Sequence, residues 1–194
     1  MFLSFTEILH AAIMTFVVGW LFMDTTGVHR VRTPEEYVRA AKSRLDWNSF
    51  WFASLLVGSS ILLHEFGHKI VAIAFGLDAT FHAAFFWLVL AVIMKLALGF
   101  VFFVPAYVSI SGFAPPGVYA LTALAGPAVN FALYGFAKLM LAVSQERKRK
   151  LSAKERLFWT LSARINLFLG IFNCIPIPGF DGYQVLENLF QMFF

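Results

Sequence analysis

Long apolar stretches constrain the fold of this 194-residue chain more than any other feature of its sequence. Several run for about 18 or more residues with almost no charge, enough for a helix to cross the roughly 30 Å of hydrocarbon in a bilayer. Hydrophobic residues make up 60% of the chain and charged residues 13%, whereas soluble domains average about 45–50% and about 25%. The sequence therefore predicts an all-α, polytopic membrane protein and excludes an ordinary soluble domain.

The apolar stretches predict about four full spans. They lie at about 5–23, 48–75, 118–143 and 158–175. A fifth apolar stretch, 83–108, is divided near its middle by Lys95 and is followed by a segment rich in proline and glycine, so we expect a re-entrant or interfacial hairpin there. The tail at 183–194 is too short to cross and is expected to form an interfacial helix.

The whole chain, 1–194, is expected to form a single multi-pass domain in the cell membrane. Its core is predicted at about 48–185, and 1–47 adds one N-terminal span and a polar loop. Most lysines and arginines lie in two short loops, as membrane topology requires, so the net charge of +4 does not indicate binding to nucleic acid. The sequence gives no indication of the oligomeric state.

The segment His64-Glu65-Phe66-Gly67-His68 carries the chemistry. Positions four apart lie on one face of a helix, so His64 and His68 can present imidazole nitrogens to one metal ion. Glu65 lies beside them and can reach a water molecule on that ion without being a ligand. Ionisable groups inside an apolar helix are costly unless something compensates them, which disfavours a chance occurrence. The sequence predicts a catalytic zinc site with Glu65 as general base.

Catalytic zinc normally takes a third protein ligand and keeps a fourth position for water or substrate. Acidic candidates are few: Glu7 is better explained as an interfacial acid, and Glu187 lies in the short tail. Asp181 follows the helix-ending segment Pro176–Pro178 and precedes Gly182, which allows a sharp turn. From these residues alone, Asp181 is either the third ligand or an ordinary loop aspartate beside a glycine turn.

Two further motifs follow the histidine pair in the sequence. The first reads Gly126-Pro127-Ala128-Val129-Asn130, and the second reads Asn173-Cys174-Ile175-Pro176-Ile177-Pro178-Gly179-Phe180-Asp181-Gly182. In this order the three motifs resemble the site-2 protease family of intramembrane zinc metalloproteases, which pairs His-Glu-x-x-His with Asn-x-x-Pro-x-Pro-x-x-Asp-Gly. Many members also carry Gly-Pro-x-x-Asn between them. The resemblance covers about 55–185.

This resemblance implies the ligand set and the substrate class. It implies that His64, His68 and Asp181 bind one catalytic zinc ion and that Glu65 is the catalytic base. It also implies a zinc metalloendopeptidase whose partners are transmembrane-helix proteins. These would be cleaved in or near their membrane segments within the lipid bilayer, as in regulated intramembrane proteolysis.

Three asparagines are candidates for supporting roles, each with a structural alternative. Asn130 either holds the substrate backbone or an oxyanion, or it serves the structure. Asn173, inside the aspartate motif, either orients a ligand or substrate or makes a packing contact between helices. For Asn166, seven residues earlier, helix packing is the favoured interpretation.

Zinc binding also constrains the topology. The histidines and Asp181 can meet only if the helices that lead to them run toward the same face, which requires that 83–108 does not cross simply. Both basic loops then lie on the face opposite the zinc. The positive-inside rule would place the zinc toward the outer face, whereas the family resemblance implies the cytosolic face, so the orientation is left open.

Two other functions are compatible with histidines and acids inside spans. A metal-ion transporter would have several in-span ligand sites and often an inverted repeat, whereas this sequence has one cluster and no repeat. A catalytically inactive relative that acts as a membrane binding module would not need the intact Glu65.

Overall fold

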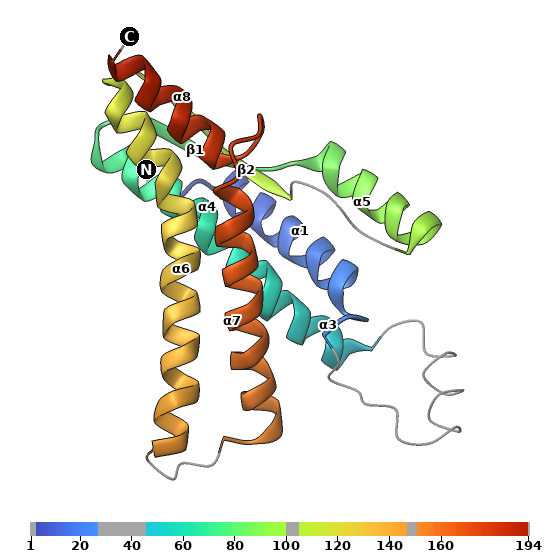
Figure 1. Ribbon diagram of the computed structural model, residues 1–194. Coiled ribbons are helices and arrows are strands. Elements are labelled where there is room, and N and C mark those ends of the chain that lie inside the picture. Colours follow the sequence, from blue (N-terminus) through green and yellow to red (C-terminus); the bar gives the residue numbers. More distant parts are fainter. Residues whose placement is uncertain (1–2, 27–45, 100–104, 147–150, 194) are drawn as a thin grey trace.

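Helices dominate the computed structural model, which describes residues 3–26, 46–99, 105–146 and 151–193. In chain order the elements are α1 (Phe5–Phe22), α3 (Trp47–Ala53), the π-helical turn η1 (Ser54–Gly58), α4 (Ser59–Ala74), β1 (Asp78–Ala83), α5 (Phe85–Leu98), β2 (Ala106–Ser111), α6 (Pro116–Glu146), α7 (Ala153–Asn173) and α8 (Asp181–Phe193). In Figure 1, α6 and α7 run side by side, α4 crosses behind them, and α5 extends away from the other helices.

Three of these helical segments are long and apolar enough to cross a membrane. They are Phe5–Phe22, the continuous rod Trp47–Ala74 formed by α3, η1 and α4, and Pro116–Ser144 within α6. This finding agrees with a membrane protein, and the count of four full spans stays a prediction. The fourth predicted span, 158–175, corresponds to α7, which begins five residues earlier and includes three charged residues in its first turn.

Capping residues explain where two of the helices begin. Ser152 accepts a hydrogen bond from the backbone N–H of Glu155, whose carboxylate accepts one from the backbone N–H of Ser152, and this capping box starts α7. Ser4 and Glu7 form the same reciprocal pair at the start of α1. In both cases the motif satisfies N–H groups that have no partner within the helix.

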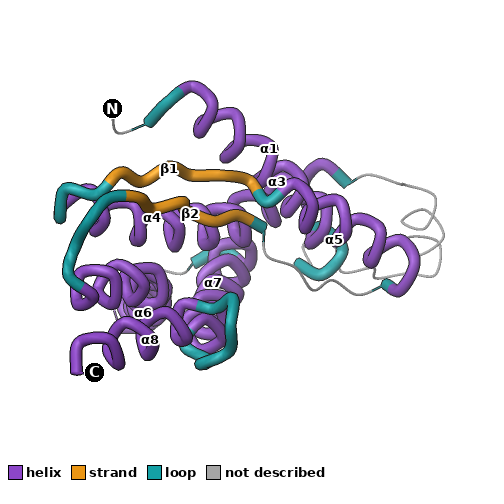
Figure 2. The backbone as a smooth tube through the Cα atoms, turned by 90° about the horizontal axis from the view of Figure 1, so that it is seen from above, coloured by secondary structure: helices purple, strands orange, loops and turns teal. Residues whose placement is uncertain are grey.

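The sequence prediction of an all-α chain missed a two-stranded sheet. Strands β1 and β2 pair antiparallel, from Asp78 opposite Ser111 to Ala83 opposite Ala106, and Figure 2 shows them running beside α4. The stretch predicted as a hairpin at 83–108 is instead the 14-residue helix α5, followed by β2. A helix of this length is shorter than a full crossing requires, and the expectation that 83–108 does not cross simply stays a prediction. The apolar pattern hid the strands, because short apolar runs of helix and strand look alike.

A buried ion pair joins α1, α4 and the sheet. Lys69 of α4 bonds to Glu7 of α1, and both side chains are almost fully buried. The Glu7 carboxylate also accepts a hydrogen bond from the backbone N–H of Phe81 in β1, at 2.7 Å. The interpretation of Glu7 as an interfacial acid was therefore wrong, because the sequence does not reveal a partner 62 residues away.

Helix α1 also packs closely against the π-helical turn η1. A Cβ added to Gly19 would lie 1.8 Å from Ser54 Oγ, and one added to Gly58 would lie 2.8 Å from Thr15 Cγ2. Small residues therefore let the two helices approach. At the far end of α1, Lys95 of α5 donates to the Trp20 carbonyl at 2.7 Å and pairs with Asp24 at 2.8 Å, which holds α5 against α1.

Helix α8 matches the helix predicted for the C-terminal tail. It lies against α6 and carries exposed apolar side chains, such as Leu186 and Phe190, with none of its residues buried. Its place at the membrane interface stays a prediction. The single-domain organisation with a core at 48–185 also stays a prediction. Much of the predicted polar loop, 27–45, lies outside the described residues.

Candidate metal centre

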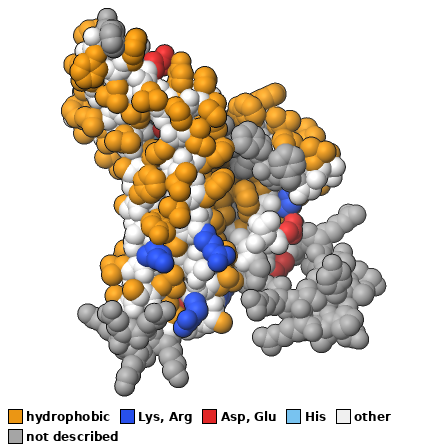
Figure 3. Space-filling view, in the orientation of Figure 1, with side chains coloured by type: hydrophobic (Ala, Val, Ile, Leu, Met, Phe, Trp, Pro, Cys, Tyr) orange, Lys and Arg blue, Asp and Glu red, His pale blue; other side chains and the backbone are white. Residues whose placement is uncertain are grey.

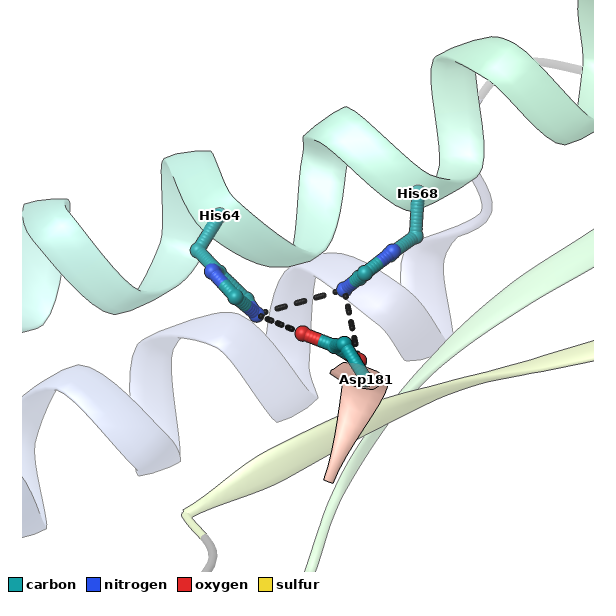
Figure 4. Close-up of side chains that lie close together, drawn as sticks. All are labelled: His64, His68 and Asp181. Carbon is teal, nitrogen blue, oxygen red and sulfur yellow. Dashed lines mark hydrogen bonds and ion pairs between the residues drawn. The ribbon is translucent and has the colours of Figure 1, made fainter. Parts of the chain in front are cut away.

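Helix α4 places the two histidines of the motif on one face. His64 and His68 are one turn apart, and their Nε2 atoms lie 3.2 Å from each other. Both side chains are buried, at 6% and 7% exposure. The geometry is that expected from the four-residue spacing, with both rings directed away from the helix toward the same point (Figure 4).

Asp181 reaches the same point from the first residue of α8. Its Oδ2 lies 3.1 Å from His64 Nε2, and its Oδ1 lies 3.4 Å from His68 Nε2. Two glycines allow the approach: Gly179 has a φ of +98°, and a Cβ on Gly182 would lie 2.2 Å from the Cys174 carbonyl oxygen. The structure thus brings the carboxylate to the paired imidazoles, on the same side of the molecule.

Hydrogen bonds at the Nδ1 atoms determine which nitrogen of each imidazole carries the proton. His68 Nδ1 lies 2.8 Å from the Thr122 backbone carbonyl, which can only accept, so Nδ1 carries the proton. His64 Nδ1 lies 2.6 Å from Asn130 Oδ1. Asn130 Nδ2 donates to Asn166 Oδ1 at 2.9 Å, which assigns its oxygen as the acceptor from His64. In the neutral rings both Nε2 atoms are therefore unprotonated and present lone pairs.

The resulting donor set fits a zinc ion. Two imidazole lone pairs and a carboxylate converge, and the buried Oδ2 of Asp181 has no hydrogen-bond partner among the described residues. Zinc bonds of about 2.0–2.1 Å in tetrahedral geometry would hold ligand atoms about 3.3–3.4 Å apart, close to the separations of 3.1–3.4 Å found here. A cation at this point would remove the repulsion between the facing lone pairs.

Helix α6 leaves room for the rings at Gly126. A Cβ added there would lie 2.3 Å from His68 Nε2 and 2.7 Å from His64 Cε1. A larger residue would thus occupy the space in which the two imidazoles meet. This close approach accounts for the glycine in the Gly126–Asn130 motif.

The Asp181 carboxyl is ionised in this setting. Burial raises its pKa, but when a proton rather than a metal ion occupies the site, hydrogen bonds and positive charge from His64 and His68 outweigh burial and lower the pKa to about 2. At neutral pH the side chain is therefore a carboxylate, which is the form that binds a metal ion.

A cavity of about 500 Å³ opens beside these residues. His64 and Glu65 line one wall, and α7 contributes most of the opposite wall, including Phe168 and Phe172. Glu65 is itself 8% exposed. Its carboxylate thus lies next to the histidines and at the surface of a mostly apolar space, where a substrate group and a water molecule could meet it.

The three asparagines have different places. Asn130 is fully buried, and Asn166 links it to Ser60 Oγ at 3.0 Å, so both support His64 rather than facing the cavity. Asn173 lines the cavity, and its amide donates to the Leu169 carbonyl at 3.0 Å. Asn166 of α7 bonds to Asn130 of α6 and to Ser60 of α4, which agrees with the favoured interpretation of a helix-packing residue.

The sequence analysis did not identify Thr122, because it contacts His68 through its backbone carbonyl, a group that every residue type has. The one available signal was its position four residues before Gly126, on the same face of α6. The Thr122 hydroxyl itself donates to the Val118 carbonyl at 2.8 Å, within its own helix.

Comparison with known proteins supports a metal-dependent hydrolase. A scan against models of protein families gives no match. A protein of Methanocaldococcus jannaschii named "Putative zinc metalloprotease MJ0611" is 37% identical over 142 residues, which cover 71% of this chain and 70% of that protein. The Bacillus subtilis protein "Putative zinc metalloprotease YwhC" is 31% identical over 142 residues, or 67% of this chain and 65% of that protein. The chain therefore belongs to the zinc-metalloprotease family for which these two relatives are named.

Proposed function

We propose that the protein is an intramembrane zinc metalloendopeptidase of the site-2 protease type. It hydrolyses peptide bonds in or near the transmembrane segments of other membrane proteins, and it resides as a multi-pass protein in the cell membrane. The observation that carries the proposal is the convergence of His64, His68 and Asp181, whose ligand atoms all lie within 4.8 Å of one another. Three helices able to cross a membrane and the names of the two relatives support it.

Each residue of the centre has a distinct role in this proposal. His64, His68 and Asp181 hold one zinc ion, which when bound lowers the pKa of water and polarises a carbonyl group. Glu65 accepts a proton from the attacking water as the hydroxyl adds to the scissile carbonyl carbon. Glu65 then delivers that proton to the amide nitrogen as the carbon–nitrogen bond breaks. The products are a new carboxylate and a free amine.

The cavity supports a peptide substrate rather than a small polar one. Its walls are mostly apolar side chains, which suit residues from a membrane segment. A helical amide is already hydrogen-bonded and shielded, so the segment must unwind locally before its carbonyl can reach Glu65. Asn173 lines the cavity, and its side-chain oxygen accepts no hydrogen bond from the described residues. We assign it to hold an N–H group of the unwound strand.

The proposal is tested by measuring metal content and cleavage in the same purified samples. Glu65→Gln should retain zinc and lose cleavage of a bilayer-tethered helix, because the base is removed and the ligands are kept. His68→Ala should lose both. Mass spectrometry of the products should place the cut in or near the membrane segment. Normal cleavage by Glu65→Gln, or zinc-independent cleavage by the wild-type protein, would refute the proposal.

A further inference from the structure

One face of α7 forms a continuous wall of the cavity. Its lining residues recur at helical spacing: Leu161, Arg164, Ile165, Phe168, Phe172 and Asn173. From Leu161 to Asn173 this wall is about 18 Å long at 1.5 Å per residue. The other wall includes Val57, Ile61, His64 and Glu65 of the α3–α4 rod. The cavity is therefore a groove along two helices, long enough for several residues of a bound chain.

Contacts between the two walls give their relative register. The Phe52 ring packs edge-on against Phe158 with centroids 6.0 Å apart, and Ser60 Oγ accepts a hydrogen bond from Asn166 at 3.0 Å. The residues of each pair are 106 positions apart in the sequence. The α3–α4 rod and α7 therefore run parallel, with the same rise per residue. Arg164 then lies level with Gly58, six residues before His64. It is displaced from the metal centre by about 9 Å along the groove.

Arg164 is the one lysine or arginine among the described residues that line this groove. No carboxylate in the described part of the chain lies within ion-pair distance of its guanidinium, in contrast to Lys69 and Lys95. It stands eight residues beyond Arg156, or about 12 Å further along α7. On the face seen in Figure 3, several basic side chains lie on the lower half of the α6–α7 region, and hydrophobic side chains predominate above them.

A charge in this position needs a partner. Helix α7 corresponds to the predicted fourth span, 158–175, and an arginine on a membrane helix normally faces a polar cavity or an ion partner, because its transfer into hydrocarbon is unfavourable. Besides apolar side chains, the described lining of the groove offers the hydroxyls of Thr25 and Thr26, the amide of Asn173 and, at the metal centre, His64 and Glu65. Both hydroxyls donate to carbonyls at the end of α1, and none of the described carboxylates forms an ion pair with Arg164. Arg164 is itself exposed. As far as the described residues go, its guanidinium is therefore open to water or to a group that enters with the ligand.

We propose that Arg164 is a specificity residue that selects substrate segments carrying an acidic side chain near the scissile bond. The inference rests on the proposed protease function. A guanidinium binds a carboxylate through paired, charge-assisted hydrogen bonds, and exclusion of water from the occupied groove strengthens them. A lipid phosphate fits less well, because Arg164 lines the same groove as His64 and Glu65, among mostly apolar side chains.

The distance along the groove predicts where the acid lies in the substrate. A separation of about 9 Å corresponds to roughly three residues of extended chain at about 3.3 Å each. It corresponds to roughly six residues if that part stays helical. The preferred glutamate or aspartate should therefore lie three to six residues from the cleaved bond, on the side that faces the Ala153 end of α7.

The test uses the full chain and pairs of synthetic transmembrane peptides that differ by one residue, glutamate or glutamine, at each position three to six from the cut. The wild-type protein should cleave the best glutamate peptide about tenfold or more faster than its glutamine partner. Arg164→Gln should bring this ratio close to one, and Arg164→Glu should reverse it in favour of a lysine peptide. Arg156→Gln, which changes an arginine of the same helix outside the groove, should keep the wild-type ratio.

A binding measurement separates this inference from the proposed function. The Glu65→Gln protein should bind the glutamate peptide about tenfold or more tightly than the glutamine peptide, in an Arg164-dependent manner. Such binding without cleavage by the wild-type protein would overturn the protease proposal and keep the role of Arg164. Cleavage with equal rates for both peptides would overturn the role of Arg164 alone. Equal loss for both peptides in Arg164→Gln would indicate a purely structural residue, against the inference.

Discussion

Two buried clusters lie on different faces of α4, and they differ in how their charges are satisfied. On one face Lys69 bonds to Glu7, whose carboxylate also accepts two backbone N–H groups. On the other face His68 meets His64 and Asp181, where, in the neutral rings, the two Nε2 lone pairs face each other and the carboxylate. The first cluster is complete within the protein, whereas the second is completed only by a cation. Neighbouring residues in the sequence thus serve stability and chemistry separately.

Breaking the ion pair should have the largest effect on folding. Lys69→Ala leaves Glu7 charged and buried without its partner, so we expect the free energy of unfolding to fall by about 3–5 kcal/mol. Denaturation in mixed micelles would measure the loss. The double variant Glu7→Gln, Lys69→Met should recover part of it, because no charge is then left unpaired. A loss that does not change when zinc is chelated would show that the two clusters are independent.

Filling the space at Gly126 should damage the other cluster. Gly126→Ala places a methyl group 2.3 Å from the His68 Nε2 position, so the rings must move and the zinc affinity should fall by at least about a hundredfold. Competition with a chromogenic chelator would measure the affinity. Gly135→Ala is the matched control on α6, since a Cβ there meets nothing within 4 Å. Equal affinities in both variants would contradict the described geometry.

Removing the support of His64 should have an intermediate effect on the metal. Asn130→Ala deletes the acceptor that holds Nδ1 and orients the ring, and zinc affinity should fall by about 10–100-fold. Asn130→Asp restores an acceptor and should recover most of the affinity if orientation is the cause. Titration with zinc, followed by isothermal calorimetry, would distinguish the two variants.

The smallest effect is expected for Lys95. Its ion pair with Asp24 is largely exposed on the aspartate side, and such pairs contribute at most about 1 kcal/mol. Lys95→Met should therefore leave zinc affinity unchanged and lower the unfolding free energy by less than Lys69→Ala does. A larger loss would mean that α5 contributes more to the fold than its few buried residues, Leu88 and Ala91, indicate.

The sequence predicted the metal centre better than the surrounding fold. His64 and His68 follow from helical spacing, whereas the residues around Asp181 left two interpretations open and the family resemblance implied its place as the third ligand. These are local patterns, which a sequence displays directly. The pairing of β1 with β2 and the bond between Glu7 and Lys69 depend on residues far apart in the chain. No periodicity records such contacts, so they were missed.

The helix boundaries and the contacts between helices also differ in how far the sequence predicts them. The start of α7 could have been found from Ser152 and Glu155, a capping box that the apolar pattern overshadowed. In contrast, the support of His68 by the Thr122 carbonyl involves only backbone atoms of another helix. It becomes visible only when α4 and α6 are seen together.

The π-helical turn at Ser54–Gly58 sets the rotation of one half of the rod against the other. Each residue of an α-helix turns the chain by about 100°, and a π turn accommodates one extra residue locally. Deleting a single residue there would turn the aromatic start of α3, with Phe50 and Trp51, by about that angle relative to the imidazoles. The helix could then bury Phe50 or direct its histidines toward Asp181, but it could not do both at the same time. One inserted residue thus determines whether two distant surfaces of the same rod are in phase.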